Sequence, residues 1–277
     1  MEIQKATNDP SLQFKAMSSL LHFLAEEFRS TANPAYLGTK RDRLVRRVTG
    51  IPDPYAQSKH ISNQKALEVL PLARKLVSNE ASTELRFRKA CLCSIVGNII
   101  EFDIPDNPFK FTDLRKLIQE AEEDLAIDEI SQIFKEAKEA KNILYLADNA
   151  GEIAFDTLLV QELKKMGPHI VVAVKGGPVL NDATLKDAEY VGMHVVADEI
   201  TTTGTDTVGF VSNECSKEFL SVYNSADFVV AKGMGYAETL TELQLEAPHA
   251  LLLRTKCSPV ANFFGVSTGK NVAKLML

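Results

Sequence analysis

The stretch LYLADNAGEIAFD, residues 144–156, decides the fold. It begins as a short apolar run, passes through the adjacent polar residues Asp148 and Asn149 and the small residues Ala150 and Gly151, and then takes up a helix-like pattern. This order indicates a buried strand, a turn and a helix. Ligands of parallel sheets bind outside the carboxyl ends of the strands. The stretch therefore predicts an α/β fold with two polar side chains at a ligand-binding edge.

The second half of the chain repeats this alternation. Short apolar runs begin at residues 142, 170, 194, 227 and 249. The stretches between them are long enough for helices, which is the signature of parallel strands joined by crossover helices. We therefore predict an α/β domain over residues 141–277.

The first 140 residues have the pattern of helices. Apolar residues recur near helical spacing, with charged residues on the opposite side. The predicted helices cover residues 11–30, 62–78, 84–100, 111–123 and 128–140. In the second of these, Ser62 is a candidate N-cap and Pro71 a candidate kink. We predict an all-helical domain over residues 1–140.

Composition and charge limit the partners. The 277 residues carry a net charge of −6, with lysine and arginine spread along the chain, which argues against a nucleic-acid groove. No run approaches the ~20 apolar residues of a membrane span, and the chain's start lacks the apolar core of a signal peptide. The four cysteines form no repeated Cys-x-x-Cys, so reduced thiols are expected. These features predict a cytoplasmic protein that binds neither nucleic acid nor membrane, and they leave its oligomeric state open.

Each predicted strand ends in a polar cluster. Because the carboxyl ends of parallel strands meet at one edge, we expect these clusters along a single rim. They are Asp148 with Asn149, and then residues 175–184, 198–209, 232–238 and 254–256.

Three of these side chains suit a metal ion. Asp148, Asn149 and Asp182 form an all-oxygen set that fits Mg²⁺ or Mn²⁺ and leaves positions open for water and substrate. The two carboxylates would just neutralise a divalent ion. A phosphoryl oxygen could then bind the metal and a helix N-terminus together, while Lys256 would add a point charge for the phosphate. The pattern indicates metal-assisted phosphoryl chemistry.

The same residues have ordinary structural interpretations. Asp and Asn after a strand often cap the next helix. The hydroxyls of Thr201–Thr203 suit a turn, and Lys256 suits a helix end or solvent. The five histidines show no ligand spacing and are interpreted as structural. The functional interpretation is favoured because the polar residues coincide at one rim.

Five stretches of the second half, in order, resemble the successive motifs of a known family. They are LADNAGEIAFD, VKGGPVLNDATLKDAE, TGTDTVG, AKGMGYAETL and LLRTKCSPVA. Upstream, DPYAQSKHISNQKALEVLP and SIVGNIIEFD resemble helical-domain motifs of the same family. The family is DUF89, the metal-dependent damage-control phosphatases, and the resemblance covers roughly residues 50–265.

The resemblance implies a fold and an activity. The fold would be a helical bundle domain followed by a Rossmann-like α/β/α domain with a mostly parallel sheet. The activity would be hydrolysis of phosphate monoesters of small metabolites, such as sugar phosphates or damaged phospho-metabolites. The implied cofactor is a divalent metal, Mg²⁺, Mn²⁺, Co²⁺ or Ni²⁺.

The resemblance also assigns roles to residues. The family's metal-binding Asp-Asn pair falls on Asp148 and Asn149, its second aspartate on Asp182, and its phosphate-binding lysine on Lys256. These four are the expected catalytic residues. Expected substrate-binding residues, from the motifs and from the loops after the strands, are Asn98, Glu101, Gly176, Gly177, Asp206, Lys232, Gly233 and Gly235.

Three departures from the family pattern bear on these roles. Prokaryotic members often have a Cys-x-x-Cys near the N-terminus, which is absent here. Glu101 stands where the family usually has Asp, and Tyr236 stands where many relatives have a polar group. Asn98 and Glu101, three apart on a predicted helix, share a face and would point into the cleft between domains. Asn98 beside Gly97 equally suits a helix C-cap.

Other functions fit less well. A haloacid dehalogenase would need an Asp two residues after Asp148, where this chain has Ala150. A carboxyl methyltransferase would need a glycine-rich loop, and this turn has only Gly151. A non-catalytic protein that binds metal or sugar phosphates stays open as an alternative. For a phosphatase, the nucleophile is either a metal-bound water or Asp148.

Overall fold

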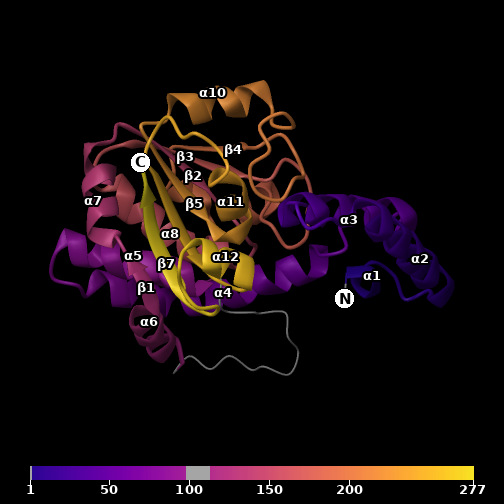
Figure 1. The fold of residues 1–277 in the computed structure, drawn as a ribbon. Coiled ribbons are helices and arrows are strands. Elements are labelled where there is room, and N and C mark those ends of the chain that lie inside the picture. Colours follow the sequence, from indigo (N-terminus) through magenta and orange to yellow (C-terminus); the bar gives the residue numbers. More distant parts are fainter. Residues whose placement is uncertain (1, 98–112) are drawn as a thin grey trace.

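The fold is built on one seven-stranded sheet. The computed structural model describes residues 2–97 and 113–277, and within them the strands lie in the order β1–β7–β6–β5–β2–β3–β4 (Figure 1). Neighbouring strands run parallel except β6 and β7, which are antiparallel. The strands are β1 (Leu125–Asp128), β2 (Asn142–Leu146), β3 (His169–Val174), β4 (Glu199–Thr202), β5 (Phe228–Lys232), β6 (His249–Arg254) and β7 (Asn271–Met276). The predicted α/β fold with a mostly parallel sheet is confirmed.

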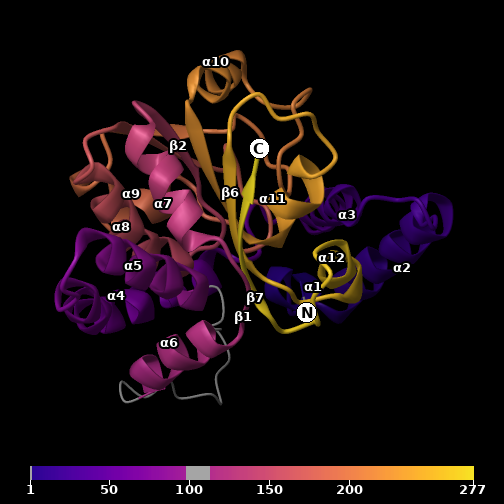
Figure 2. The same cartoon turned by 60° about the vertical axis from the view of Figure 1, so that its left-hand side comes forward.

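Alternate residues of the strands pack into two separate cores. In β2, Ile143 and Tyr145 face one core, while Leu144 and Leu146 face the other, because side chains alternate across a strand. The first core is covered by α4 (Ala56–Ser78), α5 (Thr83–Gly97), α6 (Asp113–Glu123), α7 (Ile130–Glu139), α8 (Glu152–Lys164) and α9 (Leu185–Tyr190). The second core is covered by α10 (Lys217–Ser225), α11 (Gly233–Leu240) and α12 (Ser258–Phe263). Figure 2 shows the sheet between these two groups of helices.

The first three helices form an arm that extends to one side of the sheet (Figure 1). They are α1 (Glu2–Ala6), α2 (Pro10–Glu27) and α3 (Pro34–Thr49). The arm has a small core of its own, made by Ile3, Ala6, Ala16 and Val45. It joins the rest of the molecule through ion pairs from Arg43 and Arg46 of α3 to Asp206.

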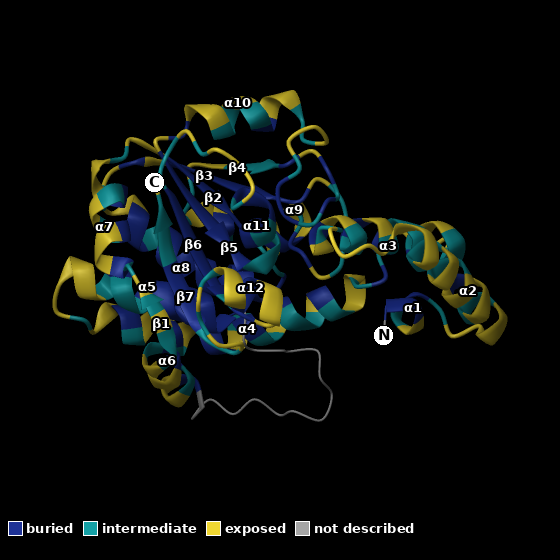
Figure 3. Ribbon diagram, viewed as in Figure 1, coloured by how far each residue is buried: buried dark blue, intermediate teal, exposed yellow. Residues whose placement is uncertain are grey.

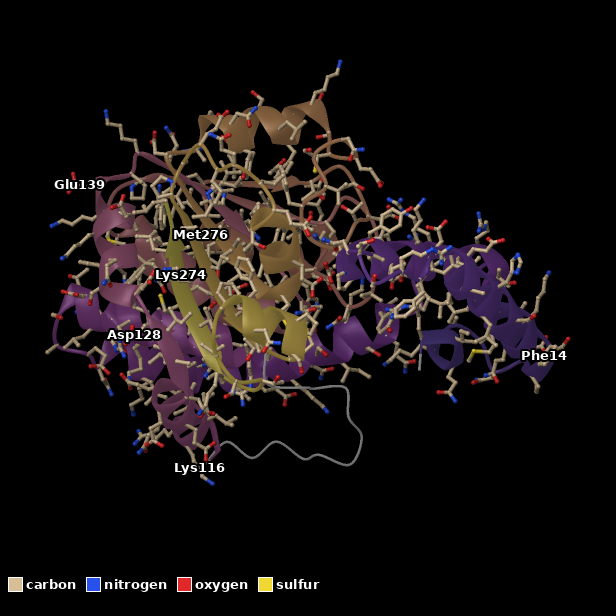
Figure 4. The ribbon with its side chains drawn as sticks, in the orientation of Figure 1. Phe14, Lys116, Asp128, Glu139, Lys274 and Met276 are labelled. Carbon is tan, nitrogen blue, oxygen red and sulfur yellow. The ribbon has the colours of Figure 1, made fainter. Side chains whose placement is uncertain are left out.

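The helix predicted over residues 11–30 is α2, but much of its apolar face is not buried. Ala16 lies in the arm's core, whereas Phe14, Met17, Leu21 and Phe28 are exposed. Figure 3 shows α2 mostly in the colours of exposed and intermediate residues. Phe14 lies at the outer end of the arm (Figure 4). The spacing of apolar residues therefore predicted the helix and overestimated its packing.

Other helix boundaries need correction. Because α4 begins at Ala56, the predicted N-cap Ser62 lies inside the helix, as does Pro71. The helix predicted over 84–100 is α5, and its last predicted residues, 98–100, lie outside the described part of the chain. The helices predicted over 111–123 and 128–140 are α6 and α7.

Helix α3 was not predicted, although the sequence carries its signals. Asn33 caps it by accepting hydrogen bonds from the backbone of residues 35 and 36, and Pro34 occupies its first turn. Gly50, with φ 73°, ends it in the left-handed conformation that glycine adopts most easily.

The strand prediction was wrong at one position and incomplete at two. The run HVVA, residues 194–197, predicted a strand, but residues 193–195 form a 3₁₀ turn that begins after Gly192, and the strand is β4. Its sequence, EITT, lies within the hydroxyl-rich cluster 198–209 that was predicted to follow a strand, yet Ile and Thr are β-branched and favour strands. The short edge strand β1 and the antiparallel strand β7 were missed.

The boundary predicted at residue 140 stays a prediction. Strand β1 and helix α7 precede that residue, and β1 pairs with β7 of the sheet.

No helix in the described residues has the length and apolar character to cross a membrane. All four cysteines are free thiols, and burial raises the pKa of Cys93 to about 12.

Candidate active site

Asp148 and Asn149 lie where β2 ends and are half-buried. The chain turns sharply after them because Gly151, at φ 81°, adopts a backbone conformation that other residues rarely take. Gly151 occupies the N-cap position of α8, and no side chain caps that helix. The capping interpretation of Asp148 and Asn149 therefore does not apply.

Backbone contacts hold Asp182 beside Asp148 and Asn149. Residues 149 and 182 form an isolated β-bridge. The amide of Ala150 donates to the carbonyl of Asn181 (2.9 Å), and the amide of Ala183 donates to the carbonyl of Asp148 (2.7 Å). Helix α9 begins at the N-cap Thr184, so Asp182 does not cap it. Three side chains that sequence reasoning grouped together thus come from two adjacent loops that are tied to each other.

The site concentrates negative charge. The pKa of Asp148 is well above its usual range because of burial and the nearby charges of Glu152 and Asp182. The pKa of Asp182 is raised to about 6, because burial outweighs the attraction of Lys175 and Lys59. A divalent cation would relieve this repulsion. The two carboxylates and the amide oxygen therefore fit a hard cation.

The fit depends on the amide as well as on the carboxylates. In the described residues, no group of three or more His, Cys, Asp or Glu side chains could hold a metal ion. An ion at this rim would need Asn149 together with Asp148 and Asp182, and oxygens of water or substrate for the rest of its coordination.

Lys175, directly after β3, belongs to the same site and was not predicted. Its side chain is buried, and its Nζ lies 3.6 Å from Oδ2 of Asp182. It donates to the carbonyl of Gly209 (2.9 Å) and lies 4.3 Å from the ring centre of Tyr236. A lysine at the end of a buried strand is a signal that sequence reasoning had available. Tyr236, noted as a departure from the family, is buried and packs against this lysine.

Gly233 brings the backbone of α11 against Asp148. A Cβ atom on this residue would lie 1.8 Å from Oδ2 of Asp148, and its φ is 78°. Only glycine fits here. Gly235 packs against Val208 and Gly209, where a Cβ atom would lie 2.9 Å from the Val208 side chain. The first turn of α11, residues 233–235, thus borders the candidate site.

Lys256 lies close enough to act on Asp148, since its charge lowers the pKa of that carboxyl against the larger effect of burial. Its backbone amide lies 3.2 Å from Sδ of Met234, which places the loop after β6 beside the first turn of α11. The predicted phosphate-binding lysine is therefore on the same rim as the acidic residues.

Gly176 and Gly177 pack against a neighbouring loop. The amide of Gly176 donates to the carbonyl of Thr205 (2.9 Å), and a Cβ atom on Gly176 would lie 2.5 Å from the backbone of Gly204. A Cβ atom on Gly177 would lie 3.4 Å from Cβ of Asp206. The amide of Gly176 already donates to a protein acceptor. The close packing of the two loops therefore explains why a glycine occupies position 176.

The side chains of Asp206 and Lys232 both form ion pairs with other residues. Arg43 donates from Nε to Asp206 (3.0 Å), and Arg46 binds the other carboxylate oxygen. Burial raises the pKa of Asp206, but these hydrogen bonds outweigh it and hold the pKa below its usual range. Lys232 lies below the rim and is fully buried. Of the remaining predictions, Asn98 and Glu101 lie outside the described residues.

Asn63 of α4 is a further residue that sequence reasoning missed. Its Oδ1 accepts from the amide of Gly151 (2.7 Å), and its Nδ2 donates to Oδ1 of Asp187 (2.8 Å). It is buried and links the starts of α8 and α9. Beside it, a cavity of about 550 Å³ lies between α4, the loop 175–178 and α9. The signal was its place in the upstream motif, DPYAQSKHISNQKALEVLP.

The fold and site define a class: an α/β protein with a cluster of acidic and amide oxygens at the carboxyl ends of its strands. A family model described as the damage-control phosphatase ARMT1-like domain matches residues 1–272. The chain belongs to this family, and the resemblance to DUF89 proteins is confirmed.

Similar proteins come from three archaea. An uncharacterised protein of Methanocaldococcus jannaschii is 38% identical over 96% of this chain and 88% of its own length. A damage-control phosphatase of Archaeoglobus fulgidus is 36% identical over 99% and 94%. The crystal structure of a DUF89 family protein from Pyrococcus horikoshii matches with a TM-score of 0.87 at 31% identity, covering 98% of this chain and 92% of the other.

Proposed function

We propose that this protein is a phosphatase that hydrolyses phosphate monoesters of small metabolites, such as sugar phosphates or damaged phospho-metabolites, with the help of a divalent metal ion. The observation that carries the proposal is the contact between the loops holding Asp148, Asn149 and Asp182, where both carboxyl pKa values are raised. Similar proteins from Archaeoglobus fulgidus and Pyrococcus horikoshii bear the name damage-control phosphatase, which supports the activity. The predicted cytoplasmic location would place the enzyme among such metabolites.

Asp148, Asn149 and Asp182 would hold the ion, which can be Mg²⁺, Mn²⁺, Co²⁺ or Ni²⁺. A divalent ion supplies positive charge that stabilises the transferring phosphoryl group. Lys256 would bind another phosphate oxygen from the neighbouring loop. Lys175 would keep Asp182 ionised by its charge, 3.6 Å away.

The first turn of α11, residues 233–235, would bring backbone amides to the phosphate. Gly233 lies against Asp148, so amides that follow it are near the place where a phosphoryl group would bind. The attacking group is either a water molecule or the carboxylate of Asp148. The configuration at a chiral phosphorus would distinguish the two. A single in-line attack by water inverts it, whereas attack by Asp148, followed by attack of water on phosphorus that breaks the bond to Asp148, gives two inversions and net retention.

Phosphate release from p-nitrophenyl phosphate and a panel of sugar phosphates tests the proposal. The native protein, Asp148→Ala and the control Asp227→Asn are compared without metal and with each of the four ions. Asp227 lies at the opposite end of β5, where it accepts hydrogen bonds from the backbone of Lys141 and Asn142. We expect metal-dependent release that is lost in Asp148→Ala and kept in the control. Metal binding without release from any substrate would favour a non-catalytic binding protein.

A further inference from the structure

The side-chain amide of Asn149 is held in one orientation by two carboxylates. Its Nδ2 donates to Oδ2 of Asp148 (2.7 Å) and to Oε2 of Glu152 (3.0 Å). When a bound cation keeps both carboxylates ionised, the reversed amide would turn its carbonyl oxygen toward two acceptors that have no proton to donate. Oδ1 is the only atom of this amide that can ligate a cation, so the orientation decides whether Asn149 is a ligand.

Asp148 and Glu152 hold this amide in different ways. Asp148 is itself a proposed ligand, and a cation would draw on the same carboxylate. Glu152 is in the first turn of α8, with only 1% of its surface exposed, and its other oxygen, Oε1, accepts from Lys232. Glu152 is therefore fixed from the side away from Asn149.

Lys232 fixes Glu152 because all three of its protons are engaged. Its Nζ donates to Glu152, to Oδ1 of Asp156 (2.9 Å) and to the carbonyl of Ser94 (3.2 Å). Oγ of Ser94 also donates to Asp156 (2.7 Å). These residues are all fully buried and come from β5, α8 and α5. The cluster joins three elements beneath the rim and leaves Glu152 no freedom to turn.

We infer that Glu152 is a positioning residue, held by Lys232, that directs the carbonyl oxygen of Asn149 to the metal ion. The inference rests on the proposed metal-dependent function and adds the reason that an amide serves as a ligand there. It also assigns Lys232 to the support of Glu152 instead of to substrate binding. Residues that orient metal ligands typically change metal affinity 10- to 100-fold when they are replaced.

Mn²⁺ binding measured by isothermal titration calorimetry tests this without reference to turnover. Glu152→Gln keeps the shape of the side chain and leaves Lys232 paired with Asp156. Its new amide can present a donor to Asn149 in place of an acceptor. We expect an affinity for Mn²⁺ about tenfold or more below that of the native protein.

Asp156→Asn is the matched control. It makes the same carboxylate-to-amide change on the same helix, against the same lysine, at a side chain that accepts hydrogen bonds from Lys232 and Ser94. We expect its Mn²⁺ affinity to stay within about twofold of native, even if its thermal stability falls. Equal losses of affinity in both variants would overturn the inference, because general loosening of the cluster would then explain them.

Combining Glu152→Gln with Asn149→Asp isolates the effect of the orientation of the Asn149 amide. In Asn149→Asp, both terminal atoms are oxygens, so no amide has to be oriented. Glu152→Gln is expected to cause no further loss of Mn²⁺ affinity in this background. If Glu152→Gln causes the same loss with the native Asn149 and in the Asn149→Asp background, the positioning role is wrong and Glu152 would act as a ligand itself.

Two outcomes separate this inference from the proposed function. If the native protein binds Mn²⁺ and Glu152→Gln binds it equally well, the inference alone fails. If the native protein binds none of Mg²⁺, Mn²⁺, Co²⁺ and Ni²⁺, both fail. Should Glu152→Gln not fold, Glu152→Asp decides the question, because it keeps the charge that faces Lys232 but draws the acceptor away from Asn149. We expect weaker Mn²⁺ binding for this variant, and native affinity would refute the inference.

Discussion

Strands β3 and β5 each lead into a buried lysine, and the two lysines are held differently. Lys232, at the end of β5, has two carboxylates and a backbone carbonyl around its Nζ. Lys175, after β3, has one carboxylate at 3.6 Å, one backbone carbonyl and an aromatic ring. The first lies within a structural ion cluster, and the second lies beside a candidate ligand. Burial and sequence position alone do not distinguish these roles, whereas the partners do.

Replacing Lys232 should have the largest effect on stability. Lys232→Met leaves Glu152 and Asp156 buried without their shared cation, and breaking a buried pair in this way costs about 3–5 kcal/mol. Denaturant unfolding measures the loss. Lys274→Met is the control, because its pair with Glu129 is partly exposed and should be worth about 1 kcal/mol or less. Similar losses in the two variants would contradict the account.

Replacing Lys175 should cost less stability and more activity. Lys175→Met removes one partner of Asp182 and one hydrogen bond, for a loss of about 1–3 kcal/mol. Because Asp182 is a proposed ligand, phosphate release should also fall at least about tenfold under conditions where the variant is folded. Assays of unfolding and release on the same samples check both parts. A stability loss as large as that of Lys232→Met, with native activity, would reverse the comparison.

Gly233→Ala tests whether the residue that follows β5 affects activity more than stability. Its new Cβ atom would have to displace Asp148, so phosphate release should fall by about tenfold or more, along with about 1–2 kcal/mol of stability from the positive φ. Gly50→Ala is the matched control, since Gly50 has φ 73° and nothing within 4 Å of the added atom. It should lose stability and keep its activity. Equal activities of the two variants would argue against a site at Asp148.

The smallest effect concerns the loop that packs against the end of β3. The pKa of Asp206 is lowered when folded, through its hydrogen bonds to Arg43 and Arg46. Its contribution to stability is therefore present above the unfolded pKa of about 3.9 and is lost as pH falls through the lower folded value. Native protein should be more stable than Asp206→Asn at about pH 6, and the difference should shrink toward about pH 3. Unfolding curves at both pH values test this, and a constant difference would contradict it.

Sequence reasoning succeeded where a local pattern determines the structure. The run before Asp148 predicted β2, and the rule that ligands gather at strand ends grouped Asp148, Asn149 and Asp182, which the backbone bridge brings together. The substrate-binding and catalytic roles of these residues stay predictions. The grouping was possible because parallel strands share one edge.

Reasoning from the sequence did not extend to partners that are distant in the chain. That Lys232 would bind Glu152, or Asp206 would bind Arg43, depends on how α8 and α3 pack, and no spacing encodes it. Strand β7 was missed because its pairing with β6 is antiparallel, outside the repeated alternation of strand and helix. The exposed Phe14 shows the same limit, since an apolar helix face does not reveal how much of it is covered.

Anomalous diffraction from a crystal soaked in Mn²⁺ tests the central claim most directly. The account predicts one strong peak within coordination distance of the side-chain oxygens of Asp148, Asn149 and Asp182. A peak at another place, or no peak at this rim when Mn²⁺ binds in solution, would contradict the proposal that these three residues form the metal site.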